Sequence, residues 1–319
     1  MWTADPDASP ALVVTGASRR IGARALLADV SLRVPPAGAL AIMGPNGAGK
    51  SSLLRAVVGR LRLDAGRVEV AGQPVATARR VGRLGVVPQE TALLDHLTVT
   101  ENLALAARLA GVPARDVAAR VHDGLAWAGL EARAQAYVPT LSGGMRRRVH
   151  IVASTLHRPT LLALDEPTVG LDTESRDRVR ALLRALRDRG VALILATHDA
   201  EEAAAVCDDV AVLAAGRVLA HGAMAAVVEA AAPSARELRI SLEGTIGATA
   251  ERLLRDAGCV HEAEGDWVTT ALSSLSAVGA LEAALAPLGV RVVDAAMTAP
   301  GLHGTVARLV AAAAVERPL

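Results

Sequence analysis

The sequence predicts an α/β fold with a mostly parallel core sheet, an antiparallel β subdomain, a helical insertion and a small α+β domain at the C-terminal end. The first observation is a glycine-rich segment, Gly44–Ser52, between the apolar run Ala39–Met43 and an amphipathic stretch. The order of strand, glycine loop and helix is typical of phosphate-binding α/β folds. The second is that apolar runs at 161–164 and 191–195 alternate with helical patterns, as parallel sheets require. With 52% apolar residues among 319, the chain can bury a sizeable core in two domains.

The glycine-rich segment fits the P-loop pattern G-x-x-x-x-G-K-[ST]. Its glycines let the backbone curl so that N–H groups point at phosphate oxygens, and the following helix N-terminus adds partial positive charge. Lys50, the only lysine in the chain, would reach the β- and γ-phosphates, and the Ser51 hydroxyl would bind Mg²⁺. We therefore expect the nucleotide on Gly44, Pro45, Asn46, Gly47, Ala48, Gly49, Lys50, Ser51 and Ser52.

Composition limits the functional classes. The formal net charge of +1 argues against extensive nucleic-acid binding, so we expect no nucleic-acid partner. Cys207 and Cys259 lie far apart without metal-ligand spacing and are interpreted as buried thiols in a reducing compartment. Residues 1–10 are polar, unlike a secretory signal, and no run approaches the roughly 20 apolar residues of a membrane helix. We expect a cytosolic or peripheral protein whose membrane span, if it has one, belongs to another subunit.

The segment 12–22 looks like the nucleotide fingerprint of short-chain dehydrogenases, but Arg20 stands where that fingerprint needs glycine. The Tyr-x-x-x-Lys motif of those enzymes is also excluded, because Leu141 lies four positions after Tyr137, the only tyrosine. We interpret the region instead as antiparallel strands leading through a turn into the P-loop strand. The strands are predicted at 12–14 and 30–34, and the turn at 35–38.

The remaining elements follow from periodicity and from helix-start signals. Thr98 and Glu101 have the spacing of a capping box, and Pro113 marks a second helix start, so a helical insertion is predicted at about 90–158. We expect residues 1–10 to be disordered, a nucleotide-binding domain over 11–230, and a separate domain over 236–319. Further strands are predicted at 67–70 and 84–87, helices from 142 and over 176–189, and a linker at 230–235. The order predicted for the last domain is strand 237–242, helix 248–257, hairpin 260–272, helix 275–288, strand 290–295 and a helix from 303, which is ferredoxin-like.

Polar side chains stand where several predicted strands end. Asp165 and Glu166 follow the strand 161–164; Asp165 would hold Mg²⁺ and Glu166 would activate water as general base. His198 follows another buried strand, at the place of a γ-phosphate contact, and Gln89 ends a strand with its amide free to reach Mg²⁺ or water. Because ligands bind at the carboxyl edge of parallel sheets, we expect these residues to share one catalytic site.

A second anion site is predicted where Ser142 caps a helix and Gly143 and Gly144 expose its first N–H groups. One chain has no use for two such sites on one γ-phosphate unless they face each other across two molecules. The following run, Arg146–Arg148, is interpreted as a solvated face or a set of ion-pair partners.

Taken in order, these motifs and Gly170-Leu171-Asp172 resemble the nucleotide-binding subunit of ATP-binding cassette (ABC) transporters over roughly residues 10–230. The stretches 94–103 and 143–148 and the small C-terminal unit are most similar to the ATPases of the ABC-2 export type, including drug and sodium exporters. The resemblance implies ATP and Mg²⁺ as cofactors, and hydrolysis that drives transport.

In that family two cassettes close head to tail. The resemblance implies a homodimer or heterodimer in which ATP lies between the P-loop of one copy and Ser142, Gly143 and Gly144 of the other, while Asp172 crosses the interface. It also implies a separate transmembrane permease that meets Thr91–Leu97, at the cytoplasmic face of the cell membrane.

The sequence departs from the family pattern at two positions. Met145 replaces the usual glutamine, for which a small effect is expected, and Ile21 stands in place of the aromatic residue that stacks on adenine. Two other functions stay open. A soluble cassette ATPase of translation or DNA repair usually has two cassettes or a long coiled coil, and neither is seen; a P-loop kinase would give Ser142–Gly144 no role.

Overall fold

The computed structural model describes residues 9–231, 237–257, 259–263, 266–269, 275–298 and 301–315. The chain forms two compact units, Met1–Ala223 and Met224–Leu319. Most of the predicted disordered N-terminus and of the predicted linker lies outside the described residues.

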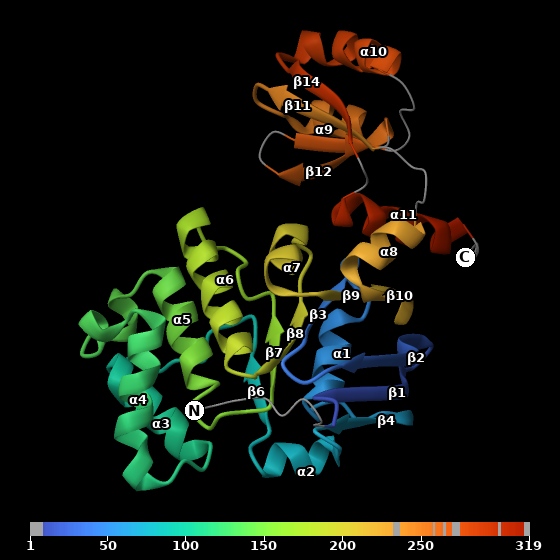
Figure 1. The fold of residues 1–319 in the computed structure, drawn as a ribbon. Coiled ribbons are helices and arrows are strands. Elements are labelled where there is room, and N and C mark those ends of the chain that lie inside the picture. Colours follow the sequence, from blue (N-terminus) through green and yellow to red (C-terminus); the bar gives the residue numbers. More distant parts are fainter. Residues whose placement is uncertain are drawn as a thin grey trace. The chain divides into compact units, whose positions relative to one another are not determined.

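The core of the first unit is a six-stranded sheet in the order β10-β9-β3-β8-β7-β6. Every pairing is parallel except that of β10 with β9. Strands β3 and β8 are buried along their whole length, which is why they read as unbroken apolar runs in the sequence. The predicted mostly parallel sheet is confirmed, and the strand ends that carry the candidate site meet at one edge (Figure 1). The strands are β3 (Ala39–Met43), β6 (Leu84–Val87), β7 (Leu161–Asp165), β8 (Ala192–Ala196), β9 (Asp209–Ala214) and β10 (Arg217–Ala223).

Three helices accompany this sheet: α1 (Lys50–Val57), α6 (Thr173–Asp188) and α7 (Ala200–Val206). Helix α1 packs against β7 and β8. Helix α6 begins three residues before the predicted start, because the Asp172 carboxylate accepts a hydrogen bond from the Ser175 N–H at 2.8 Å and caps the helix there.

The second sheet is antiparallel, as predicted, with the order β2-β1-β4-β5. Its strands β1 and β2 are much longer than the predicted ones. Register shifts between Val14 and Arg20 allow β1 to continue past the point where its alternation of apolar and polar residues breaks down. The dehydrogenase-like segment 12–22 is therefore strand β1 and the start of the turn that leads to β2. The bounds are β1 (Leu12–Ile21), β2 (Arg24–Val34), β4 (Ala65–Val70) and β5 (Gln73–Pro74), and the short helix α2 (Val75–Arg80) follows.

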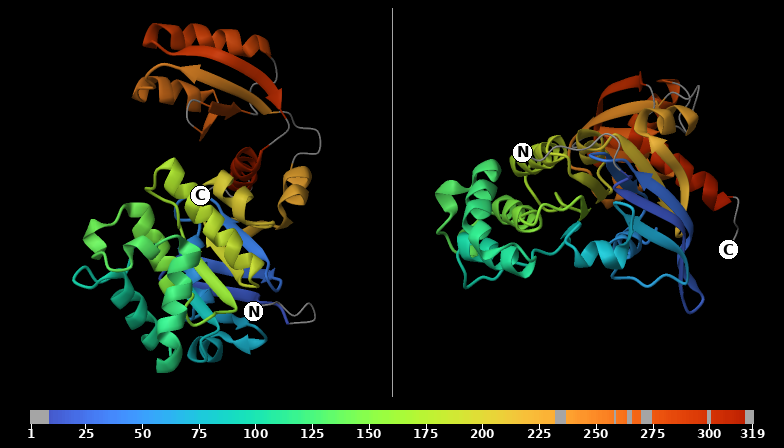
Figure 2. Two further views of the ribbon diagram at one scale, coloured as in Figure 1. Left: turned by 60° about the vertical axis from the view of Figure 1, so that its left-hand side comes forward. Right: turned by 60° about the horizontal axis from the view of Figure 1, so that its bottom comes forward.

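The helical insertion contains α3 (Val99–Leu109), α4 (Ala114–Ala128) and α5 (Gly143–Ala153), with the 3₁₀ turns η1 (Glu131–Arg133) and η2 (Val138–Thr140). These helices lie together at one side of the unit, away from the antiparallel sheet (Figure 2). The predicted capping box is present: the Glu101 N–H donates to Thr98 Oγ1 at 3.2 Å, and the Thr98 N–H donates to Glu101 Oε2 at 2.8 Å. No helix within the described ranges is both long enough and apolar enough to cross a membrane.

The second unit has a four-stranded antiparallel sheet in the order β12-β13-β11-β14, the ferredoxin-like arrangement. Ile240, Leu254, Trp267 and Leu285 lie in its core. Parts of the predicted hairpin 260–272 lie outside the described residues. The elements are α8 (Met224–Ala231), β11 (Glu237–Glu243), α9 (Ala248–Asp256), β12 (Cys259–Ala263), β13 (Asp266–Thr269), α10 (Leu275–Leu285), η3 (Ala286–Leu288), β14 (Arg291–Thr298) and α11 (Leu302–Val315).

A buried histidine makes the stability of the first unit depend on pH. His150 on α5 is buried, and burial together with the positive charge of Arg147 lowers its pKa to about 4. The unfolded chain takes up the proton near pH 6.5, before the folded chain does, so stability is full above that pH and is lost as the pH falls towards 4. Between pH 7 and pH 5 this histidine should reduce the free energy of unfolding by about 2 kcal/mol.

We expect His150→Leu to remove this contribution when urea unfolding is followed at both pH values, and the exposed His122→Leu to leave it unchanged. Equal pH dependence in the wild type and in His150→Leu would contradict the assignment.

Candidate functional site

Two glycines give the loop between β3 and α1 its shape. At Gly44 φ is +144°, and a Cβ atom there would lie 2.0 Å from the Leu213 carbonyl oxygen. At Gly49, the N-cap of α1, φ is +111°, and a Cβ atom would lie 2.8 Å from the Leu26 oxygen. Both positions combine a left-handed backbone with close approach of another strand, which only glycine accommodates. The loop is therefore packed between the two sheets, against β9 at Gly44 and against β2 at Gly49.

Lys50, the first residue of α1, turns back into this loop. Its ammonium group donates hydrogen bonds to the carbonyl oxygens of Gly44, at 2.7 Å, and Pro45, at 3.2 Å. The side chain is only 8% exposed. Burial lowers the pKa of the ammonium group, and the negative charges of Glu166 and Asp165 oppose that shift. The positive charge thus faces the two acidic residues across the mouth of the loop.

Ser51 and Asp165 present oxygen atoms to each other. Ser51 Oγ and Asp165 Oδ1 are 3.5 Å apart, although the two residues belong to different elements, α1 and β7. Hydroxyl and carboxylate oxygens at such close range are the donors that Mg²⁺ prefers. Gln89, which follows β6, lines the same cavity. The donor set fits a magnesium ion.

Glu166 and His198 form a direct pair. Glu166 Oε2 lies 2.8 Å from His198 Nδ1, and the Glu166 N–H donates to the Ala196 carbonyl at the end of β8. Glu166 adopts φ +46°, a conformation rare for a residue with a side chain. The carboxylate is mostly buried while the imidazole is 61% exposed, so the pair spans from the sheet edge to the solvent.

These residues line one cavity of about 320 Å³. Seven P-loop residues line it together with Gln89, Asp165, Glu166 and His198. Gly44 and Pro45 accept hydrogen bonds from Lys50 and so hold its side chain in place. Sequence reasoning missed Arg24, Ala25 and Leu26, which also line the cavity. Ile21, at the end of β1, is 58% exposed and is not among the lining residues, whereas the start of β2 is; its place beside adenine stays a prediction. The P-loop members are Asn46, Gly47, Ala48, Gly49, Lys50, Ser51 and Ser52.

The other predicted ligands, Ser142, Gly143, Gly144 and Asp172, do not line this cavity. They gather in a second cluster where α5 and α6 begin. Ser142 Oγ accepts from the Met145 N–H at 3.2 Å, and both Asp172 carboxylate oxygens accept from Ser175. A Cβ atom on Gly144 would lie 2.3 Å from the Ser175 hydroxyl, so glycine is what lets the two helix starts touch. Within one chain the two predicted anion sites are therefore separate.

The interpretation of Arg146–Arg148 as a solvated face is wrong for two of the three residues. Arg147 is 5% exposed and donates to the carbonyls of Pro88, at 2.8 Å, and Gln89, at 2.7 Å. Arg148 is also buried and donates to the Ala128 carbonyl at the end of α4. Buried backbone carbonyls outside regular structure need donors, and guanidinium groups supply several at once. Arg147 therefore joins α5 of the helical insertion to the segment that carries Gln89.

Comparison with known proteins decides the family. The ABC transporter family model matches residues 27–169. Nod factor export ATP-binding protein I of Rhizobium etli is 42% identical over 207 residues, 64% of this chain and 66% of that protein. The protein of the same name from Rhizobium sp. strain N33 is 39% identical over 221 residues, 69% of this chain and 73% of that one. The chain belongs to the ABC transporter ATP-binding proteins. It is an ATPase of that family, as the sequence predicted.

Two solved structures agree with this ABC fold. One described as the ATP-binding subunit of an ABC transporter has a TM-score of 0.62 and 28% identity, covering 69% of this chain and 92% of that one. CbiO1 of Clostridium perfringens, part of the transporter complex cbiONQ, has a TM-score of 0.62 and 26% identity, covering 70% and 95%. These names favour a transporter subunit over a soluble cassette ATPase. The matched segment spans about two thirds of the first relative's length.

We expect Arg147→Gln to reduce the turnover number of this ABC ATPase by about tenfold with little change in KM. The variant loses charge-assisted hydrogen bonds to the Gln89 segment, and the hydrogen-bond acceptors of Arg147 do not belong to the P-loop. Arg147→Lys should recover part of the turnover, which simple loss of folding would not allow. The neighbouring Arg146→Gln is the matched control, and equal turnover in all three variants and the wild type would contradict the role of Arg147.

Proposed function

We propose that the chain is the ATP-hydrolysing subunit of an export-type membrane transporter and works through ATP-driven closure of a dimer. The observation that supports this best is the single cavity in which the P-loop, both acids of the β7 end, Gln89 and His198 meet. Phosphate binding and water activation are thus available side by side at the carboxyl edge of the parallel sheet.

In this proposal the triphosphate occupies the P-loop. The backbone N–H groups of the loop and the α1 N-terminus receive the phosphate oxygens, and Lys50 exchanges its carbonyl partners for the β- and γ-phosphates. Ser51 and Asp165 would hold Mg²⁺, with Gln89 in reach. The ion, when bound, neutralises phosphate charge and so stabilises the developing charge of the transition state.

Glu166 is proposed as the general base and His198 as its orienting partner. The 2.8 Å contact between them holds the carboxylate in one rotamer. Glu166 then accepts a proton from the attacking water, and the exposed face of His198 is free to contact the γ-phosphate. The hydrogen bond from the Glu166 N–H to the end of β8 keeps this carboxylate within reach of the loop.

The second cluster, around Ser142 and Asp172, is proposed to complete the site of another copy. It offers helix N–H groups suited to a γ-phosphate but lies apart from the cavity of its own chain. A homodimer or heterodimer of cassettes gives both clusters a function. The dimer would close when ATP binds and open after hydrolysis, so the presence of the γ-phosphate would decide which of the two conformations it adopts.

The segment Thr91–Leu97 is proposed as the contact with a separate transmembrane permease at the cytoplasmic face of the membrane. Leu94 is 43% exposed there, and the buried Asn102 holds the loop through hydrogen bonds to Leu94 and Leu97. The loop follows Gln89 directly, so its movement would reach the site. The direction of transport is inferred from the names of the Nod factor export relatives.

Replacing Glu166 by Gln tests the chemistry. ATP should still bind, since the P-loop is unchanged, and ATP-bound dimers should accumulate. Turnover should fall by at least about 100-fold, because an amide cannot accept the proton. Steady-state phosphate release, nucleotide binding and sedimentation in ATP and magnesium measure the three effects.

The matched control is Glu69→Gln on β4, far from the cavity, which should keep wild-type turnover. If Glu166→Gln hydrolyses ATP like the wild type, Glu166 is not the base.

A further inference from the structure

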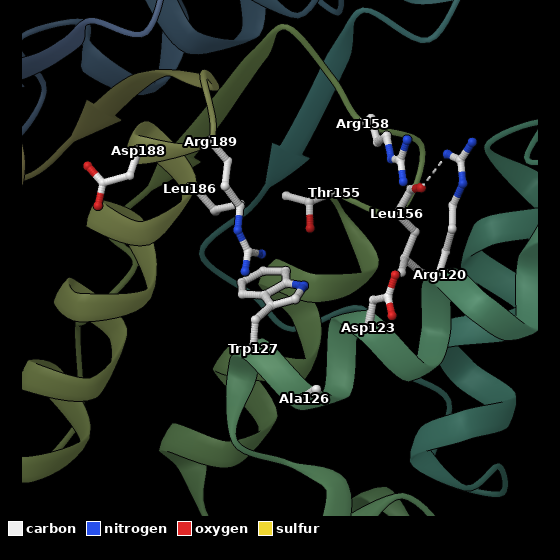
Figure 3. Close-up of a pocket in the computed structure, with 10 residues that line it drawn as sticks. All are labelled: Arg120, Asp123, Ala126, Trp127, Thr155, Leu156, Arg158, Leu186, Asp188 and Arg189. Atoms are coloured by element: carbon white, nitrogen blue, oxygen red, sulfur yellow. Dashed lines mark hydrogen bonds between the residues drawn. The ribbon is translucent and has the colours of Figure 1, made fainter. Parts of the chain in front are cut away.

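A second, larger cavity lies on the first unit, away from the nucleotide site. Its volume is about 740 Å³, against about 320 Å³ for the nucleotide cavity, and the two share no lining residue. Its walls come from α4 in the helical insertion, from the connection between α5 and β7, and from the end of α6 (Figure 3). A volume of this size is typical of sites that take small organic ligands.

Three guanidinium groups from three different elements line this cavity. They are those of Arg120 on α4, Arg158 before β7, and Arg189 at the end of α6. Arg120 donates to the Leu156 carbonyl at 2.8 Å, which places it at the same connection as Arg158. Within the described part of the chain none of the three forms an ion pair with a carboxylate. The cavity thus presents guanidinium groups that no carboxylate of the described residues contacts directly.

Two carboxylates, those of Asp123 and Asp188, also line the cavity, so three guanidinium groups against two carboxylates leave one net positive charge. Asp123 lies within ion-pair distance only of His122, at 3.8 Å, among the described residues. The Asp188 carboxylate points away from the other lining side chains (Figure 3). A ligand with a phosphate group would therefore meet two adjacent guanidinium forks, the geometry that suits bidentate contact with phosphate oxygens.

The opposite side of the cavity offers an aromatic face. The guanidinium carbon of Arg189 lies 5.2 Å from the centre of the Trp127 ring, and Trp127 is half-buried. Leu156 and Leu186 add buried apolar surface nearby. Indole and stacked guanidinium are planar groups on which another flat ring packs well. The cavity thus has the Arg120 and Arg158 guanidinium groups on one side and the Trp127 ring on the other (Figure 3).

We propose that this cavity is a binding site for a small aromatic phosphate, with its phosphate on Arg120 and Arg158 and its ring against Trp127 and Arg189. A nucleoside monophosphate has this chemistry and fits the volume. Because α4 and the end of α6 both contribute lining side chains, a bound ligand joins the helical insertion to the core of the ATPase. Nothing in the hydrolytic mechanism uses these four side chains.

Calorimetric titration of the full chain with phenyl phosphate tests the proposal. We expect saturable binding in the wild type and equal affinity in Lys50→Ala, whose P-loop is impaired. Arg158→Glu, at an exposed position, should weaken this binding by at least about tenfold, through loss of charge-assisted hydrogen bonds. Trp127→Leu should weaken it by about fivefold. Arg108→Glu, the same charge change on the exposed face of α3, should bind like the wild type.

Inorganic phosphate should bind more weakly than phenyl phosphate, since it has no ring. The proposal is overturned if phenyl phosphate does not bind, if binding disappears in Lys50→Ala, or if Arg158→Glu and Arg108→Glu weaken it equally. Equal affinity for the two phosphates would overturn the aromatic part of the site.

Discussion

The hydrogen bonds from the Lys50 ammonium group to the carbonyls of Gly44 and Pro45 organise the nucleotide site. They hold the loop around the Lys50 ammonium group, whose charged form is destabilised by burial. A bound phosphate would therefore stabilise this buried positive charge strongly. The lysine can take this position only because Gly44 and Gly49 let the loop pass against neighbouring backbone. Substrate binding, the placement of Ser51 and the facing acids all depend on this arrangement.

The parallel sheet supplies the rest of the site by bringing the ends of β3, β6, β7 and β8 to one edge. β3 leads into the P-loop, β6 is followed by Gln89, β7 delivers both Asp165 and Glu166, and β8 is followed by His198. Hydrogen bonds such as that from the Glu166 N–H to the Ala196 carbonyl fix their spacing. Arg147 then connects this edge to the helical insertion through the Gln89 segment. A movement of the insertion would therefore change the position of Gln89 directly, through a single buried side chain.

Much of the fold and site could be predicted from the sequence, because the P-loop and the strand-end acids are local patterns with fixed chemistry. The capping box at Thr98 and Glu101 was readable for the same reason. The length of β1 could not be predicted, since register shifts hide its alternation of apolar and polar residues. The burial of Arg147 depends on carbonyls 58 and 59 positions away, which no local pattern reveals.

The proposed position of the triphosphate between two cassettes can be tested by a structure of the chain with magnesium and a hydrolysis-resistant ATP analogue. We expect Lys50 of one copy and Ser142 of the other to contact the same γ-phosphate. A nucleotide fully enclosed by one copy, with Ser142 of every neighbouring copy remote from it, would rule out the shared site.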